Sequence, residues 1–141
     1  MLADTAFEDI NEAKADMDHI YNQSDPRAYF HELNKLDYAI PDTAKPIFQK
    51  LIGHLQQHQR ETLHILDLGC SYGVNAAILK HDLSMDELYE HWGQKKMTDA
   101  TSEGVVAYDQ QFFNDIDTSE DIMVIGLDQA ENAIAYGCPW S

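Results

Sequence analysis

The sequence is short of cysteine, of positive charge and of long apolar runs, and each shortage excludes a class of protein. Two cysteines, Cys70 and Cys138, are too few and too far apart for a disulfide framework, which favours a reducing compartment. A net charge of −16, from 9 basic and 25 acidic residues, repels nucleic acid and anionic membrane surfaces. No run could cross a bilayer, and the acidic N-terminus is unlike a signal peptide. We therefore expect a cytoplasmic protein with neither nucleic-acid nor membrane partners.

Three helices are expected over residues 1–60. The first is amphipathic and runs from Thr5 to Tyr21. A shorter helix follows, in which Ser24 or Asp25 can act as the cap and Pro26 suits the first turn. The third ends near residue 58. Its apolar residues share one face: Ala44, Ile47, Phe48, Leu51, Ile52 and Leu55.

Residues 61–80 predict a strand, a tight turn and a helix. The apolar run from Thr62 to Leu68 is typical of a strand buried on both faces, as in parallel sheets. Gly69 and Gly73 permit a sharp turn close to a ligand, and small residues after the turn allow the helix to pack closely on the sheet. This segment is half of a βαβ unit.

Residues 81–121 exceed the roughly 2 to 6 residues of an ordinary connection, so they predict a helical insertion. Ser84 and Glu87 form a capping box, and a second helix is expected over residues 102–113, followed by an exposed acidic loop. A second buried strand covers residues 122–128, and a helix begins within 129–141. Four residues of the insertion share a face and suit a satellite core better than a substrate wall: Met85, Leu88, Tyr89 and Trp92.

Both predicted strands end in an acidic residue. The carboxyl ends of parallel strands meet at one edge of the sheet, so Asp67 and Asp128 are expected to lie near the ligand crevice. Carboxylates suit hydroxyls and amines, and the turn has neither of the common glycine-rich phosphate-binding patterns. A nucleoside is therefore expected, with Asp128 accepting hydrogen bonds from the ribose hydroxyls.

Two of these stretches resemble the class I S-adenosylmethionine-dependent methyltransferases. Asp67 to Gly73 is similar to the glycine-rich first motif of that family, and Val124 to Asp128 to its second-strand motif. Residues 25–30 and 45–48 are also similar to the N-terminal helices of a bacterial branch of small-molecule-type methyltransferases. The resemblance implies an α/β fold in one incomplete domain, residues 1–141. Three helices would precede a partial Rossmann-like parallel sheet, made of the first two strands of the family's seven, with a helical insertion between them.

The resemblance also implies roles for individual residues. Asp67 would bind near the amino group of S-adenosylmethionine, directly or through water, and Asp128 would hold the ribose. Backbone groups of four residues would line the methionine and adenosine moieties: Gly69, Cys70, Ser71 and Gly73. Ser71 departs from the family pattern because it replaces the middle glycine. The implied activity is methyl transfer to a small-molecule acceptor, with no catalytic base named and with Tyr29 and the insertion as a lid over the cofactor.

Several alternatives stay open. A two-stranded parallel sheet has open edges and poorly covered faces, so the chain is expected to be a fragment of a longer product or to be completed in a homo- or hetero-oligomer. It could then be a non-catalytic subunit or a regulatory binding module. A dinucleotide-dependent oxidoreductase is disfavoured by the missing glycine pattern.

Two smaller features also have alternative interpretations. His54 and His58 could bind a metal, although without a third ligand a solvated helix face is expected. Cys70 could be a reactive thiol, although a small loop residue is the favoured role.

Overall fold

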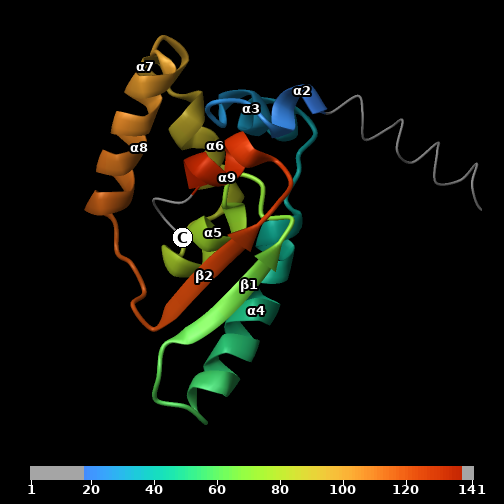
Figure 1. The fold of residues 1–141 in the computed structure, drawn as a ribbon, viewed down its shortest axis with the longest axis vertical. Coiled ribbons are helices and arrows are strands. Elements are labelled where there is room, and N and C mark those ends of the chain that lie inside the picture. The colour runs from blue at the N-terminus through green and yellow to red at the C-terminus, as the bar shows by residue number, and fades with distance from the viewer. Residues whose placement is uncertain (1–17, 138–141) are drawn as a thin grey trace, which may run out of the picture.

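The computed structural model describes residues 18–137 and has a mixed α/β fold, mostly helical, around a two-stranded parallel sheet (Figure 1). Strand β1 (Leu63–Leu68) pairs with β2 (Ile122–Leu127), and Leu66 lies opposite Ile125. Both strands lie within a residue of their predicted bounds. Most of the expected helix over residues 5–21 falls outside the described residues, and its last four form α2 (Asp18–Tyr21).

The other two N-terminal helices occur as expected, with a different cap on the first. In α3 (Arg27–Lys35), Pro26 is the N-cap residue, and the Asp25 carboxylate accepts the Arg27 backbone N–H at 3.1 Å. Helix α4 (Ile40–Gln56) packs beside β1 and beside α5 (Val74–Lys80). Even with 17 residues, α4 lacks the length and apolar character needed to cross a bilayer, as do the shorter helices among residues 18–137.

Helices α5 (Val74–Lys80), α6 (Met85–Gly93), α7 (Lys95–Thr98) and α8 (Ser102–Asp115) connect the strands, and α9 (Glu131–Gly137) follows β2. The capping box of α6 is confirmed, since Ser84 Oγ accepts the Glu87 N–H at 3.2 Å and Glu87 Oε2 accepts the Ser84 N–H at 2.8 Å. Helix α7 was not expected. Helix α8 extends two residues beyond its predicted end, which shortens the predicted loop.

The apolar side of the insertion belongs to the main core of the protein. The four residues expected to form a satellite core are all buried, in one cluster with residues of α3 and α5. Phe30 of α3 stacks on Trp92 of α6 with ring centroids 4.0 Å apart. The insertion is therefore packed against the N-terminal helices as part of a single core.

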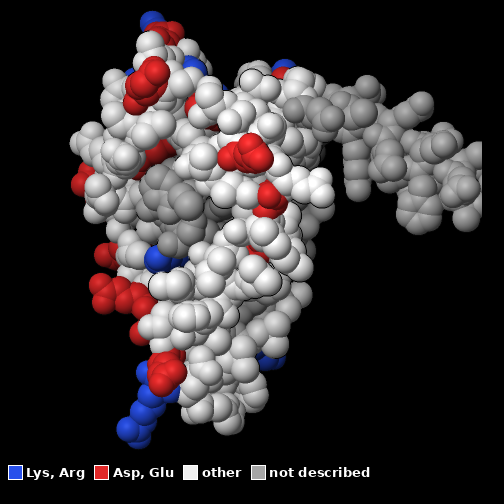
Figure 2. Space-filling view, in the orientation of Figure 1, with Lys and Arg blue, Asp and Glu red and all other residues white. Residues whose placement is uncertain are grey.

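The prediction that the strands are buried on both faces is wrong for the described part of the chain. One face packs on α5 and buries Val124, but the other exposes large apolar side chains, because no described helix covers it. We call this surface the apolar sheet face: Leu66 (60% exposed), Leu68 (69%), Met123 (46%), Ile125 (47%) and Leu127 (57%). Figure 2 shows an uncharged surface over β1 and β2. The expected apolar side of α4 is likewise exposed at Ile47, Phe48, Leu51 and Leu55.

Candidate functional site

The two strands end side by side and bring the predicted site residues to one edge of the sheet. Asp67 lies opposite Gly126 in the strand register, and Asp128 directly follows β2. The Gly69 backbone N–H donates to the Leu127 carbonyl at 2.7 Å, which ties the start of the turn to the end of β2. We call residues 69–73 the ligand loop.

The ligand loop has three residues in the left-handed region of backbone space. Gly69 has φ +73° and Gly73 has φ +80°, conformations that glycine adopts freely. Ser71 has φ +48°, which costs a non-glycine residue about 1 kcal/mol or more. Ser71 thus takes a backbone conformation that favours glycine, at the position where the methyltransferase pattern has one.

Asp128 holds the ligand loop in place. Its Oδ2 accepts the Ser71 backbone N–H at 2.8 Å, and its Oδ1 accepts the Ala130 N–H at 2.9 Å. A carboxylate oxygen has two lone pairs, so each oxygen can accept one further hydrogen bond. Asp128 can therefore accept from two hydroxyl groups while it holds the loop. The sequence did not indicate that Asp128 holds the loop.

Asp67 keeps one carboxylate oxygen free of protein donors within residues 18–137. Asn75 Nδ2 donates to Asp67 Oδ1 at 3.0 Å, whereas the buried Oδ2 has no hydrogen-bond partner there. Burial raises the pKa of Asp67, the Asn75 hydrogen bond lowers it, and the negative charge of Asp128 raises it further. A buried acceptor without a partner is costly and suits an incoming ammonium or hydroxyl donor.

Substitution Asp67→Asn is expected to stabilise the protein at neutral pH. Because folding raises its pKa, Asp67 binds a proton more tightly in the folded protein than in the unfolded protein. Ionised Asp67 therefore lowers stability at neutral pH, and this loss disappears as the pH falls through the raised pKa. Asparagine keeps an oxygen for Asn75 without the charge. Thermal unfolding should show a higher midpoint for the variant at neutral pH, converging with the wild type in acid.

The exposed Asp117→Asn variant is the control, with a change in stability within about 0.5 kcal/mol. A neutral-pH midpoint for Asp67→Asn at or below that of the wild type would contradict the assignment.

The space beneath the ligand loop is small. A cavity of about 30 Å³ lies among Asp67, Ser71, Gly126, the first turn of α5, and Ile134 and Gly137 of α9. That volume suits a single water molecule, while small-molecule pockets usually measure roughly 300 to 1,000 Å³. A nucleoside would therefore lie on the open side of the loop, where Leu68 and Gly69 are exposed.

Cys70 fills the space between the ligand loop and β2. It is buried, and a Cβ built on Gly126 would approach its Sγ to 2.6 Å. Reactive cysteines need access to their thiol, so this burial favours the packing role over the reactive one.

Substitution Gly126→Ala is expected to destabilise the protein by about 1 to 3 kcal/mol, because the new methyl group overlaps Cys70 Sγ. Chemical denaturation of the single variants and of Cys70→Ala/Gly126→Ala forms a double-mutant cycle. The double variant should recover part of the loss, since removing the sulfur leaves Cys70 Cβ, at 3.2 Å, as the closest neighbour. Strict additivity would argue against this contact.

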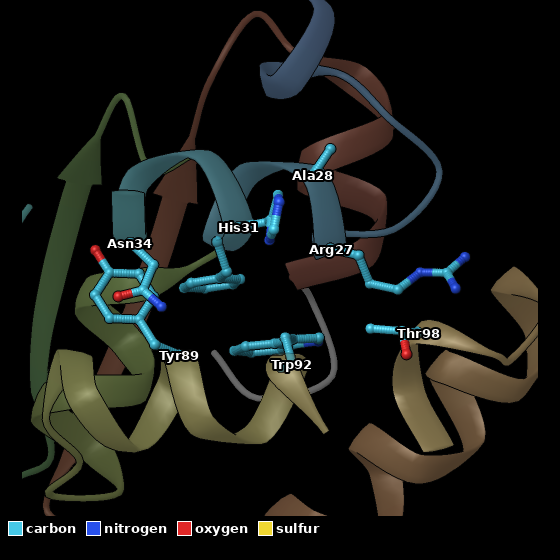
Figure 3. A pocket seen from close by; sticks show the side chains of 9 residues that line it. Arg27, Ala28, His31, Asn34, Tyr89, Trp92 and Thr98 are labelled. Carbon is cyan, nitrogen blue, oxygen red and sulfur yellow. The ribbon is translucent and has the colours of Figure 1, made fainter. Parts of the chain in front are cut away.

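A larger cleft lies elsewhere, between α3 and α6 (Figure 3). Its volume is about 510 Å³, and none of the predicted site residues lines it. Much of its polar lining is engaged within the protein: Arg27 donates to Asp25 and to the carbonyls of Met97 and Ala100, and the Tyr89 hydroxyl donates to the Tyr38 carbonyl. The strand ends are the better candidate site, because they hold the carboxylate oxygens that can accept further hydrogen bonds, although the α3/α6 cleft is larger.

No family model matches the chain, and neither a curated protein nor a solved structure matches it. The function proposed below therefore rests on the residues of this chain.

Metal ligands do not gather in the described part of the chain. Residues 18–137 hold no cluster of three His, Cys, Asp or Glu side chains suited to a metal ion. The exposed rings of His54, in the last turn of α4, and His58, just beyond the end of that helix, lie 4.8 Å apart, and His58 Nδ1 lies 2.9 Å from the His54 carbonyl oxygen. Among the described residues, this pair has no third ligand of the kind that a zinc site needs.

Proposed function

We propose that the ligand loop, Asp67 and Asp128 form the cofactor-binding half of a class I S-adenosylmethionine-dependent methyltransferase that acts on a small-molecule acceptor. The supporting observation is the pair of carboxylates beside the left-handed loop. One has a buried oxygen with no donor among the described residues, and the other has acceptor capacity to spare. The fold would then be a partial Rossmann-like sheet, the first two strands of that family.

The two carboxylates suit the ammonium and the ribose hydroxyls of such a cofactor. Asp67 Oδ2 would accept from the ammonium of the methionine moiety, directly or through a water in the small cavity that Asp67 lines, and the Asp128 oxygens would accept from the two ribose hydroxyls. Loop backbone groups of Gly69, Cys70, Ser71 and Gly73 would line its methionine and adenosine moieties.

When bound, the cofactor supplies a methyl group that its sulfonium already activates. The task of the protein is then to orient the donor and the acceptor. Among residues 18–137 we assign no general base.

Calorimetric titration with S-adenosylhomocysteine tests the proposal. We expect saturable one-to-one binding with a dissociation constant between about 10 µM and 1 mM, because the open side of the loop is exposed to solvent. NAD, titrated in parallel, should release no binding heat. Absence of S-adenosylhomocysteine binding would overturn the proposal, and binding of NAD in its place would favour a dinucleotide-dependent oxidoreductase.

The apolar sheet face supports a second candidate function, that of a non-catalytic assembly subunit or regulatory module. Parallel sheets are normally covered on both faces, and contiguous exposed apolar patches of several hundred Å² usually mark interaction sites. Five large side chains about half exposed or more, on two strands with free edges, fit a sheet that is completed in a homo- or hetero-oligomer.

Replacing Leu66 and Ile125 with threonine should abolish self-association at micromolar concentrations and change stability by under about 1 kcal/mol, because both side chains are already exposed. Sedimentation velocity over a concentration series is the measurement. Leu36→Thr, which removes a side chain 65% exposed at the end of α3, is the matched control and should associate like the wild type. A wild-type protein that is monomeric throughout would count against self-assembly through this face.

A further inference from the structure

A buried polar network joins the helical insertion to α9. Asp109 of α8 is 1% exposed, and its Oδ1 lies 2.5 Å from His91 Nε2 of α6. Its Oδ2 accepts from Trp92 Nε1 at 3.3 Å and from the hydroxyl of Tyr136 in α9. One carboxylate thus connects three helices, and Figure 1 shows α9 beside α6.

Helix α9 in turn packs against the ligand loop. The rings of Tyr136 and Tyr72 meet edge to face with centroids 6.1 Å apart. A Cβ built on Gly137 would lie 3.0 Å from the carbonyl carbon and oxygen of Tyr72, so the helix and the loop backbone are in close contact there. The chain of contacts therefore runs from Asp109 through Tyr136 to the centre of the loop.

Tyr72 is the residue through which the loop is held from several sides. It is 1% exposed, and its hydroxyl accepts the Gln23 backbone N–H at 2.7 Å. Its ring lies 5.3 Å from that of Tyr29. Tyr72 separates Ser71 from Gly73, two of the residues with left-handed backbone conformations, so a shift of its ring would disturb both.

We propose that the insertion braces the ligand loop, with Asp109 and Tyr136 as positioning residues that keep the loop in its binding conformation. Asp109 holds Tyr136, Tyr136 holds α9 against Tyr72, and Tyr72 maintains the backbone of residues 69–73. This differs from the lid expected from the sequence, because Tyr29 and the insertion act from the packed side of the loop. The consequence for ligand affinity rests on the proposed function, whereas the consequence for loop order does not.

Tyr136→Phe is the decisive variant, because it removes one buried hydroxyl and keeps the ring. Tyr89→Phe is its matched control: Tyr89 is also buried in the core, and its hydroxyl donates to the Tyr38 carbonyl at 2.6 Å, away from the loop. We expect amide hydrogen exchange of residues 69–73 to rise about tenfold in Tyr136→Phe and less than twofold in Tyr89→Phe. S-adenosylhomocysteine affinity should fall about fivefold to tenfold in Tyr136→Phe and stay within twofold of the wild type in the control.

Equal amide exchange of the loop in the two variants would contradict the proposal that Asp109 and Tyr136 brace the loop. Faster exchange in Tyr136→Phe with unchanged S-adenosylhomocysteine affinity would show that the brace is not needed for binding. If the wild type binds no S-adenosylhomocysteine, the proposed function fails, and the exchange comparison still decides whether the brace exists.

Discussion

Replacing Asp109 with alanine is expected to lower the free energy of unfolding by about 3 to 5 kcal/mol, because three buried polar groups lose this hydrogen-bond partner at a cost of about 1 to 3 kcal/mol each. The substitution leaves His91, Trp92 and the Tyr136 hydroxyl without their shared acceptor in a fully buried site. Domains of this size have roughly 5 to 15 kcal/mol of stability in all. The variant should therefore unfold at a much lower urea concentration, or be unfolded in buffer.

Urea denaturation followed by circular dichroism measures the effect. Asp117→Ala, in the exposed loop before β2, is the control and should shift stability by no more than about 0.5 kcal/mol. Asp109→Asn should give an intermediate loss, because an amide oxygen can still accept from some of the donors. A loss for Asp109→Ala below 1 kcal/mol would show that the network contributes little.

Substitution Asp128→Ala is expected to weaken S-adenosylhomocysteine binding about 10-fold to 100-fold. A hydrogen bond to a charged group contributes about 1.5 to 3 kcal/mol, and the variant also removes the acceptor that holds the Ser71 N–H. The lost hydrogen bond to the ligand and the loosened loop should both weaken S-adenosylhomocysteine binding. Calorimetric titration of wild type and variant is the measurement.

Asp121→Ala is a matched control, because Asp121 is an exposed acid that flanks β2 at its opposite end. The affinity of Asp121→Ala for S-adenosylhomocysteine should equal that of the wild type. Asp128→Asn should lie between the wild type and Asp128→Ala, since it keeps one acceptor oxygen. Unchanged binding in Asp128→Ala would remove Asp128 from the site.

Local sequence patterns predicted the features that depend on neighbouring residues. The capping box at Ser84 and Glu87 is one, and the two strands and the sharp turn at Gly69 and Gly73 are others. The meeting of Asp67 with Asp128 also followed from sequence, because parallel strands in one sheet must end at the same edge. These predictions needed only local propensity and one rule of topology.

The features that the sequence did not predict depend on contacts between distant segments. Asp109 is a single acid on an amphipathic helix, and nothing nearby distinguishes it from an exposed one until α6 and α9 pack around it. Asn75 was predicted only as a small residue, although its position in the first turn of α5 directs its amide toward Asp67. The apolar run around Leu66 wrongly predicted burial on both faces, because such a run shows that a strand can be buried and does not show which elements cover it, whereas the count of two strands did predict poorly covered faces.

The central claim is that S-adenosylhomocysteine binds at the carboxyl ends of the two strands. Nuclear magnetic resonance titration of the labelled protein, with every backbone amide followed, tests it directly. We predict the largest shifts at residues 67–73 and 126–130, where the ligand loop and Asp128 meet. Shifts confined to the α3/α6 cleft around His31 and Trp92, or no shifts at all, would contradict the claim.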